Sequence, residues 1–427
     1  MNQIQLLKMQ TLINSEIGKL EGVIIHTPGH EVENMIPENA ERALYSDILN
    51  LSIASQEYSQ LSCILKMVSR TYEVKKMLTD IIDNKVAKMQ LLHDICFNED
   101  ITGMEEYLAN KSATDLASLL IEGVPLERNN LTHYLSKKKF LLRPLHNMFF
   151  TRDPAMGINS NMLIGRMANP VRERETIIME AIFKHHPVFE TSTLNPIKPL
   201  RGIPLDEKAT LEGGDLQVIR EDIYVIGTGI RTSTQGIDFI IENIKSQKKD
   251  THHIIVQELP STPESFIHLD MVFTCLDVDT CIVYEPVIHR LSPYRTIYIL
   301  IENGKVIIKE RANIHEALKK LGIDLKPLSC GGKNDLWIQE REQWHSGANF
   351  LALSPGKIIG YERNMYTLEE LNNNGFEIQK ASDIISGKAS VDDHKKCVIT
   401  MEGSELARGG GGARCMTLPV KRKKVNW

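Results

Sequence analysis

The sequence predicts an α/β fold built from several small sheets rather than from one long parallel sheet. After residue 145, short apolar runs alternate with amphipathic helical patterns along almost the whole chain. Residues 223–233 and 356–364 share a layout of strand, arginine and polar cap before a helix, and residues 162–183 give a third instance. We therefore expect irregular repetition of one strand-and-helix unit, and a circular array of such units would bring their loops to a common centre.

The amino-terminal part predicts folded structure from about residue 15. Residues 22–26 are apolar and a Thr-Pro-Gly turn follows them, which predicts a buried strand, whereas residues 1–13 predict only a short amphipathic lead-in. Apolar side chains at three- and four-residue steps predict a helix over 55–69. A strand is expected at 72–77.

The stretch from about residue 78 to residue 137 predicts a helical insert. Its apolar residues keep helical spacing, and no convincing strand interrupts them. Helices are expected to begin at Asp100 or Thr102 and at Ser112 or Thr114, whose side-chain oxygens can cap backbone amides. The simplest interpretation is a lid or dimerisation subdomain without chemistry of its own.

Beyond the insert, the pattern predicts a long alternation of short strands and amphipathic helices. In chain order these elements are expected at 162–166, 175–183, 217–219, 223–227, 236–244, 252–257, 272–277, 281–284, 296–301, 306–310, 314–321, 350–353, 357–361, 368–374 and 396–401.

The composition is that of a globular chain without a general affinity for polyanions. Of the 427 residues, 25% are charged and 42% are apolar, which excludes a collagen-like or wholly disordered chain. The net charge of −5 makes nucleic acid an unexpected partner. No uncharged apolar run approaches the ~20 residues of a membrane helix, and the first residues lack a signal-peptide pattern. The seven cysteines show no CxxC pair and no zinc spacing, so we expect a cytoplasmic protein without a metal site.

Cys415 lies in the most unusual segment of the chain. Four consecutive glycines, Gly409 to Gly412, precede it, and Arg408 and Arg414 flank it. The glycines let the backbone approach a ligand closely, and the arginines would favour a thiolate. A reactive thiol and a small buried cysteine beside a flexible loop both fit this pattern. A phosphate cradle is disfavoured because the Gly-Lys-Ser/Thr ending of a P-loop is missing.

Two further pairs of polar residues are candidates for facing a ligand. His268 and Asp270 lie two apart, so on an extended segment their side chains point to the same side; the alternative is a solvated strand end. Glu212 and Asp215 enclose a glycine pair, in a turn that would present carboxylates to a cationic ligand or a metal. A surface turn without a ligand is the alternative there.

A third candidate segment runs from Asn147 to Pro154. Phe149 and Phe150 would wall a dry pocket in which a planar cation meets the Asp153 carboxylate, unless the segment is a strand end with one phenylalanine in the core. Together, these segments supply one thiol, one imidazole and several carboxylates, without a serine nucleophile elbow or a GxGxxG loop. That set suits attack by sulfur on a cationic carbon.

Seven ordered blocks of the sequence resemble arginine deiminases. They are FTRDP (150–154), VRERET (171–176), EGGD (212–215), RTSTQG (231–236), HLDMVFT (268–274), REQWHSGAN (341–349) and GGARCMTLP (411–419). The segment SEIGKLEGVIIHTPG (15–29) and the helical insert match that family too. The resemblance implies an α/β fold in the form of a five-bladed pseudo-symmetric (pentein-like) propeller, formed by residues 14–77 and 138–427, with an inserted helical subdomain at 78–137.

The resemblance also implies the chemistry. Cys415 would be the nucleophile, Asp153 and Asp270 would hold a guanidinium, and His268, oriented by Glu212, would be the acid and base. Free L-arginine would be hydrolysed to L-citrulline and ammonia through a covalent cysteine thiouronium, with no cofactor and no metal. A guanidinium needs carboxylates that match its N–H fork, and its charge should favour the thiolate once it is bound.

The amino-acid end of the substrate has its own candidates. Asn147, Arg172 and Arg231 match positions that bind the α-carboxylate and amino group, and Asp215 matches a supporting acidic position of the same substrate site. One position departs from the family: arginine is usual five residues before the nucleophile, and this chain has Gly410. The missing side chain is neutral, loosens recognition of the amino-acid end, or marks a related substrate.

Several alternatives stay open at this point. A related hydrolase would act on methylarginine, agmatine or peptide arginine, or carry arginine on to ornithine as a dihydrolase; Arg172 and Arg231 speak against agmatine, which lacks a carboxylate. A catalytically inactive arginine sensor is a different class. A papain-like protease is excluded by the order of cysteine and histidine. The basic run at 421–424 is expected to be a solvated tail rather than a nuclear-import or anionic-surface patch. A homo-oligomer is left open.

Overall fold

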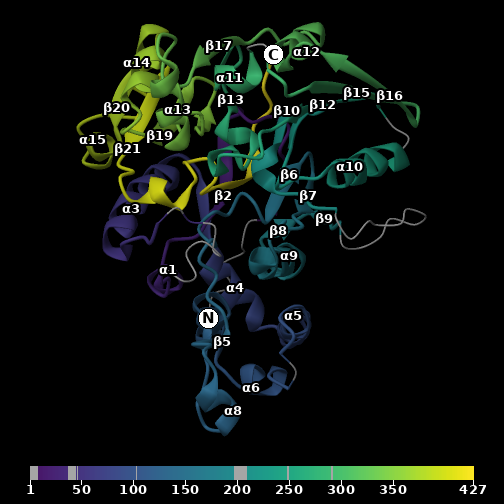
Figure 1. The fold of residues 1–427 in the computed structure, drawn as a ribbon, viewed down its shortest axis with the longest axis vertical. Coiled ribbons are helices and arrows are strands. Elements are labelled where there is room, and N and C mark those ends of the chain that lie inside the picture. The colour runs from purple at the N-terminus through teal and green to yellow at the C-terminus, as the bar shows by residue number, and fades with distance from the viewer. Residues whose placement is uncertain are drawn as a thin grey trace.

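The fold repeats one strand-and-helix plan five times (Figure 1). The computed structural model describes residues 8–36, 45, 47–101, 103–196, 209–247, 250–289 and 292–427. In each of five sheets, a first strand pairs antiparallel with a second, a helix follows, and a later strand returns parallel to the second. We call each such sheet with its helix a blade. The predicted α/β propeller is confirmed.

The blades are numbered along the chain, each given as first strand, second strand, helix and parallel strand. Blade one is β22 (Leu418–Arg422), β2 (Leu20–Ile25), α3 (Leu51–Val68) and β3 (Arg70–Glu73); blade two is β6 (Ala155–Ile158), β7 (Asn161–Ile164), α9 (Glu173–His185) and β9 (Ser192–Leu194); blade three is β10 (Leu216–Arg220), β11 (Ile223–Thr228), α10 (Thr234–Gln247) and β12 (His252–Glu258); blade four is β13 (Phe273–Asp277), β14 (Thr280–Val283), α12 (Ile314–Lys320) and β17 (Lys326–Ser329); blade five is β18 (Leu351–Ser354), β19 (Lys357–Tyr361), α14 (Met365–Asn373) and β21 (Cys397–Met401).

Some elements extend the blades. The hairpin of β15 (Thr296–Glu302) and β16 (Lys305–Arg311) adds two antiparallel strands to the sheet of blade three, at the right edge of Figure 1. In blade five, β20 (Glu377–Lys380) pairs parallel with β21. The shorter additions are α1 (His30–Glu33), β8 (Phe189–Glu190), α11 (Glu285–Ile288), α13 (Leu336–Trp344) and α15 (Ala381–Ile385).

The helices between blades one and two lie apart from the five sheets, at the bottom of Figure 1. They are α4 (Val74–Ile82), α5 (Lys85–Asn98), α6 (Glu105–Ala109), α7 (Ala113–Glu122) and α8 (Leu131–Leu135), with a short ladder of β4 (Val124–Pro125) and β5 (Phe140–Leu142). The Ser112 hydroxyl accepts from the Asp115 amide at 3.1 Å and caps α7, as predicted. The helix expected to begin at Asp100 or Thr102 is α6, which begins at Glu105 after Met104, and the Met104 side chain makes no capping hydrogen bond. Thr102 lies outside the described residues.

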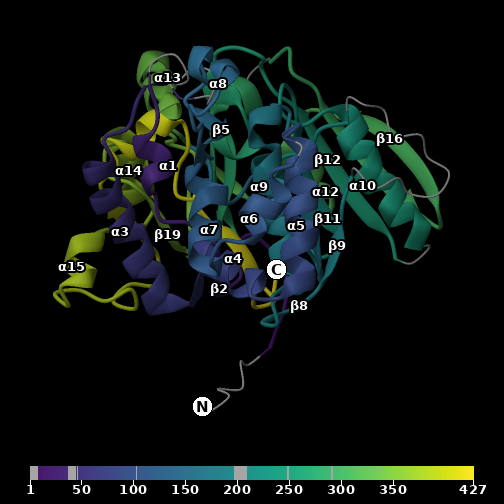
Figure 2. The same cartoon turned by 90° about the horizontal axis from the view of Figure 1, so that it is seen from below.

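The insert packs on blade two through one shared apolar core. Leu92 and Ile95 of α5 and Ile178 and Ile182 of α9 are fully buried in the same cluster. Figure 2 shows α5 and α9 side by side. Burial of such side chains contributes roughly 1.5–3 kcal/mol each, so the insert is joined to the propeller by a continuous core.

Three local expectations are corrected by the structure. The strand expected at 72–77 ends at Glu73, and α4 begins at Val74, because the apolar residues that follow lie on the buried face of a helix. Folded structure begins before residue 15: β1 (Met9–Gln10) pairs parallel with β8, and Met9 is buried. The basic run at 421–424 is not a free tail, since β22 ends at Arg422 and that side chain is 1% exposed.

The ring is closed by the two ends of the chain. Strand β22, near the carboxyl terminus, pairs antiparallel with β2, near the amino terminus, and so completes blade one. Within the described ranges, no helix combines the length and apolar character needed to cross a bilayer.

Candidate functional site

The site is built from the loops that enter the five blades. In every blade, a polar residue stands one to five positions before the first strand: Asp153 before β6, Glu212 and Asp215 before β10, His268 and Asp270 before β13, Asn349 before β18, and Cys415 before β22. All seven side chains are at most 5% exposed. Repetition of the blade therefore brings residues up to 262 positions apart to one centre, as the hydrogen bond from Arg152 Nε to the Arg414 carbonyl shows.

The Cys415 thiol is buried beside an amide and a carboxylate. Its Sγ lies 3.1 Å from Nδ2 of Asn349 and 3.6 Å from Oδ2 of Asp270. Burial, and then the charges of Asp270 and Asp153, raise the pKa of the Cys415 thiol well above its usual value. The sulfur is therefore a thiol in the substrate-free structure, and a cation bound beside it would favour ionisation.

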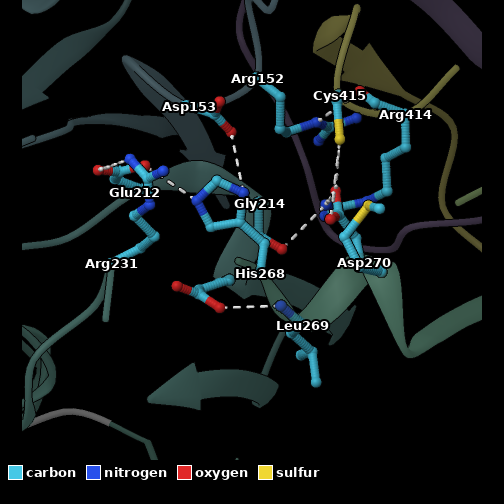
Figure 3. A network of polar contacts seen from close by, with 12 residues as sticks. Arg152, Asp153, Glu212, Gly214, Arg231, His268, Leu269, Asp270, Arg414 and Cys415 are labelled. Carbon is cyan, nitrogen blue, oxygen red and sulfur yellow. Dashed lines mark hydrogen bonds and ion pairs between the residues drawn. The ribbon is translucent and has the colours of Figure 1, made fainter. Parts of the chain in front are cut away.

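His268 stands between two acids (Figure 3). Its Nε2 lies 2.9 Å from Oε2 of Glu212, and its Nδ1 lies 3.7 Å from Oδ1 of Asp153. Burial alone would lower the pKa of His268, but the charge of Asp153 and the hydrogen bond to Glu212 outweigh it and raise that pKa to about 9. The hydrogen bond with His268 and the charge of Arg231 overcome the effect of burial on Glu212 and lower its pKa to about 2. The imidazole is therefore protonated at neutral pH.

The sequence predicted that His268 and Asp270 lie on an extended segment with their side chains on one side, and this prediction is wrong. A 3₁₀ turn spans Leu269–Met271, so the two side chains leave the backbone in different directions. His268 faces Glu212 and Asp153, whereas Asp270 faces Cys415 and Arg414. Both still border the sulfur-containing centre, because a tight turn rather than a strand separates them.

Both acids predicted to hold a guanidinium already hold one from the protein. Oδ2 of Asp153 lies 2.8 Å from Nη1 of Arg172, and Oδ2 of Asp270 lies 2.8 Å from Nη1 of Arg414. Arg414 is also fixed by Glu16, 3.2 Å away, and by the Leu216 carbonyl. Each of the two carboxylates thus pairs with a planar cation of the protein itself.

The residues predicted to bind the amino-acid end border a small cavity. Asn147, Arg172 and Arg231 line it together with Asp153, His268 and Cys415, and its volume is about 20 Å³. That space holds about one water molecule. A larger cavity of about 260 Å³ adjoins it, and both are lined by Arg231, Ile267 and Gly410. The larger cavity leads from Trp344 and Ile230 towards the buried centre.

Asp215 lies behind His268 rather than in the cavity. Its side chain is fully buried, and Oδ1 accepts from the Leu269 amide at 2.9 Å. Burial raises the pKa of Asp215 to about 7. A Cβ on Gly214 would stand 2.4 Å from Nδ1 of His268, so the glycine pair lets the imidazole pack directly on this turn. Asp215 thus holds the loop that carries His268, and the residue does not line the substrate space.

The segment before β6 divides its two aromatic residues between pocket and core. Phe150 lines the small cavity, whereas Phe149 is fully buried and packs on Phe150 with ring centroids 4.2 Å apart. Arg408 does not flank the thiol: its side chain is 42% exposed and pairs with Asp47 and Glu405. The flanking arginine that reaches the centre is Arg414, and it neutralises Asp270 rather than contacting sulfur.

Some residues at the centre make contacts that the sequence did not predict. Glu16 and Arg152 are buried beside Arg414, and Asn349 contacts the sulfur. Asn349 and Arg414 lie in two of the blocks that resemble arginine deiminases, so membership of these blocks was the one feature of the sequence that could have marked them as site residues. Glu16 lies between β1 and β2, in the segment 15–29 that also matches the family, but its local sequence has no pattern that marks a buried ion pair.

One group of acids and imidazole has the spacing of a cation site. Within the described part of the chain, atoms of Asp153, Glu212 and His268 are the set that lies within 4.8 Å of one another. However, Nη1 of Arg172 lies 4.0 Å and Nη1 of Arg231 lies 3.9 Å from Glu212. With His268 protonated as well, three cationic side chains already balance these carboxylates, so the donor set fits an internal ion network better than a metal.

Comparison with known proteins places this geometry in a family. The arginine deiminase family model matches residues 41–422. Arginine deiminases of Bacillus cereus (strain ATCC 10987 / NRS 248) and Listeria monocytogenes serotype 4b (strain CLIP80459) are each 32% identical to this chain, over 97% and 98% of it and over 98% and 100% of their own lengths. A solved N-terminal domain of ArgZ, described as an arginine dihydrolase from the ornithine-ammonia cycle in cyanobacteria, is similar with a TM-score of 0.52 at 14% identity, covering 95% of this chain and 98% of that chain. At that identity the likeness concerns the fold.

Proposed function

Because the chain belongs to the arginine deiminase family and is an enzyme that hydrolyses arginine, we propose that it converts free L-arginine to L-citrulline and ammonia through a covalent thiouronium on Cys415. The observation that carries this proposal is the meeting of five entry loops at one buried thiol. The Cys415 sulfur lies 3.6 Å from Asp270, the His268 imidazole lies 3.7 Å from Asp153, and Cys415, His268 and Asp153 line one small cavity.

Substrate binding begins with exchange of partners. The small cavity of about 20 Å³ is far below the volume of arginine, so the site opens when substrate enters through the adjoining 260 Å³ cavity. The substrate guanidinium replaces the Arg172 guanidinium on Asp153 and shares Asp270 with Arg414. Arg172 is then free to pair with the substrate's α-carboxylate, together with Arg231. Asp153, Asp270 and Arg172 each keep a partner of opposite charge in this exchange.

Attack follows from the charge that the substrate brings. Its guanidinium, held beside Sγ by Asp270, offsets the acids that keep Cys415 protonated, so the thiol releases its proton to solvent as the substrate binds. The thiolate then adds to Cζ. His268 donates its proton to the leaving nitrogen, the C–N bond breaks, and ammonia departs while the C–S bond remains. Glu212 keeps the imidazole oriented during this transfer.

Water completes the cycle. The neutral imidazole left after the first step removes a proton from a water molecule, which adds to the thiouronium carbon. The C–S bond then breaks and its electron pair returns to sulfur, while the hydroxyl on the same carbon loses its proton and becomes the ureido carbonyl of citrulline. That proton restores the Cys415 thiol.

The test is product analysis with purified protein. L-arginine, agmatine and a methylarginine are each incubated with the wild type and with Cys415→Ser, and ureido product, ornithine and ammonia are measured. One citrulline and one ammonia per arginine, with no product from Cys415→Ser, is the expected result. Ornithine with two ammonia would replace the proposal by a dihydrolase. Arginine that binds to the wild type without reacting would replace it by a sensor.

A further inference from the structure

In four of the five blades, the loop that enters the blade supplies a residue with a role in the proposed chemistry. Blade two supplies Asp153, blade three Glu212, blade four His268 and Asp270, and blade one Cys415. The loop entering blade five supplies Asn349, two positions before β18, and the side chain is 1% exposed. By topology, Asn349 occupies the position that bears a reacting or positioning group in every other blade.

The contacts of Asn349 fix the direction of its amide. Oδ1 accepts from the backbone amides of Arg414, at 2.9 Å, and Cys415, at 3.3 Å. If the side-chain amide were flipped, its N–H groups would point at these two backbone N–H donors. Nδ2 is therefore the atom that faces the sulfur. Nδ2 donates to Sγ of Cys415 at 3.1 Å and to the Asp270 carbonyl at 3.3 Å.

The nucleophile loop is shaped to receive this amide. A Cβ on Gly412 would stand 2.6 Å from Oδ1 of Asn349, which leaves room there for glycine alone. The close approach lets one side chain hold both the backbone and the sulfur of Cys415. The loop glycines, which the sequence suggested for approach to a ligand, here also serve approach to Asn349.

We propose that Asn349 is a catalytic residue, whose N–H stabilises the Cys415 thiolate both before attack and when sulfur leaves the thiouronium carbon. The inference rests on the proposed function for its kinetic part. Physically, the sulfur otherwise faces the Asp270 carboxylate, 3.6 Å away, which opposes negative charge. An N–H donor on the other side of the same atom offsets that repulsion in a site from which water is excluded.

Asn349→Asp separates this role from a purely structural one. The carboxylate keeps an oxygen to accept from the two backbone amides, but it has no N–H to donate to sulfur. Asn364→Asp is the matched control, because Asn364 is another buried asparagine whose Nδ2 donates to a backbone carbonyl, that of His345, and it does not contact the sulfur. Asn349→Ala removes both functions and serves as the second variant.

Two readouts are compared across pH 5 to 10. The first is the rate at which iodoacetamide modifies Cys415 in substrate-free protein, followed on the peptide that contains it, and the second is kcat and KM for arginine. Because the substrate-free thiol stays mostly protonated over this range, a rise of its pKa by one unit slows modification about tenfold at each pH. For Asn349→Asp, we expect the modification rate to fall at least about tenfold and kcat to fall at least about tenfold, with KM changed by less than about threefold. Asn364→Asp should match the wild type in both.

The outcomes are distinct. Wild-type pH profiles for Asn349→Asp and Asn349→Ala, or equal losses in Asn349→Asp and Asn364→Asp, would overturn the role of Asn349. If the wild type does not hydrolyse arginine, the proposed function fails, but the modification profile still decides whether Asn349 stabilises the thiolate. If Cys415 resists iodoacetamide at every pH, the pH profile of kcat/KM gives the decision.

Discussion

At the scale of single residues, the two guanidiniums that pair with Asp153 and Asp270 differ in how firmly they are held. Arg414 pairs with Asp270 and Glu16 and donates to a backbone carbonyl, and it is not among the residues that line the two adjoining cavities. Arg172 also pairs with two acids, Asp153 and Glu175, but it borders the small cavity. Arg172 is therefore the one placed to exchange partners when substrate enters, and Arg414 is placed to remain.

Replacing Arg172 should weaken substrate binding and leave two acids without their partner. For Arg172→Met, we expect KM for arginine to rise about 10- to 100-fold, as for the loss of hydrogen bonds to a charged group. Burial raises the pKa of Glu175 to about 7 even with Arg172 beside it, and the substitution should raise that pKa further. A carboxyl whose folded pKa is raised loses stability as pH rises from its unfolded value through the folded one. The variant's melting temperature should therefore drop more at pH 8 than at pH 5.

These outcomes are measured by steady-state kinetics and by thermal unfolding at the two pH values. An unchanged KM would remove Arg172 from the substrate site. A loss of melting temperature that is equal at both pH values would mean that Glu175 is not the group left unpaired.

The raised pKa of His268 predicts the alkaline limit of activity. The imidazolium, with a pKa of about 9, is the proton donor, so kcat/KM should decline as pH rises through about 9. Glu212→Gln removes one of the acids that stabilise the imidazolium and should move this decline at least about one unit lower. The same group contributes stability below about pH 6.5 that is lost as pH rises towards 9. A decline that stays in place in Glu212→Gln would contradict this assignment.

At the scale of elements, the sequence was a good guide wherever a segment has one regular pattern. The strand expected at 357–361 has those bounds, the strand expected at 223–227 ends one residue later, and the helix expected at 236–244 spans Thr234–Gln247. The repeated strand–arginine–helix layout is real, because Arg172, Arg231 and Arg363 each lie between the second strand and the helix of a blade. Arg363 donates to the carbonyls of Gly403 and Ser404 rather than entering the cavity.

The misses have physical reasons of two kinds. Strand β17 and helix α13 are short or mixed in composition, so their burial depends on neighbouring blades rather than on a local period. The 3₁₀ turn after His268 is held by Asp215, which comes from another blade, and a single segment gives no sign of it. The pairing of Arg172 with Asp153 and of Arg414 with Glu16 joins residues whose proximity arises only from the ring.

Gly410 offers a test of the loop that covers the cavity. It has φ of +82°, a left-handed conformation that is costly for other residues, and a Cβ there would meet no atom within 4 Å. Gly410→Ala measures the backbone cost alone, which we expect to be about 1 kcal/mol of unfolding free energy. Gly410→Arg should show a similar cost but fill part of the adjoining cavity and lower KM for arginine relative to Gly410→Ala. Equal KM values in the two variants would show that the missing arginine is neutral for recognition.

At the scale of the whole molecule, the site depends on closure of the ring. Cys415, the proposed nucleophile, lies three positions before β22, the strand that pairs the carboxyl-terminal end of the chain with β2. Cys415 therefore reaches the acids of blades two to four only when the two ends have met. A change that opens the pairing of β22 with β2 should therefore also take the site apart.

Arg422 joins three parts of this closure. Its Nη1 donates to the carbonyls of Gly18, at 2.7 Å, and of Ala352 in blade five, at 2.8 Å. Burial lowers the pKa of Arg422 to about 10, although the charge of Glu16 opposes that shift. The buried cation thus links β22 to Gly18, just before β2, and to β18 of blade five.

Arg422→Met should accordingly loosen the closure without touching the chemistry. Two buried carbonyls lose their donor and Glu16 loses one of its cations, so we expect the free energy of unfolding to fall by about 3 kcal/mol in urea titrations. Lys421→Ala, next to it on β22 and partly exposed, is the control and should change it by less than about 0.5 kcal/mol. Because Arg422 does not border either cavity, kcat per folded molecule of Arg422→Met should stay near that of the wild type at low temperature. A variant as stable as the wild type would show that the ring closes through β22 backbone pairing alone, whereas a folded variant with lost kcat would show that closure and site geometry are coupled through Arg422 itself.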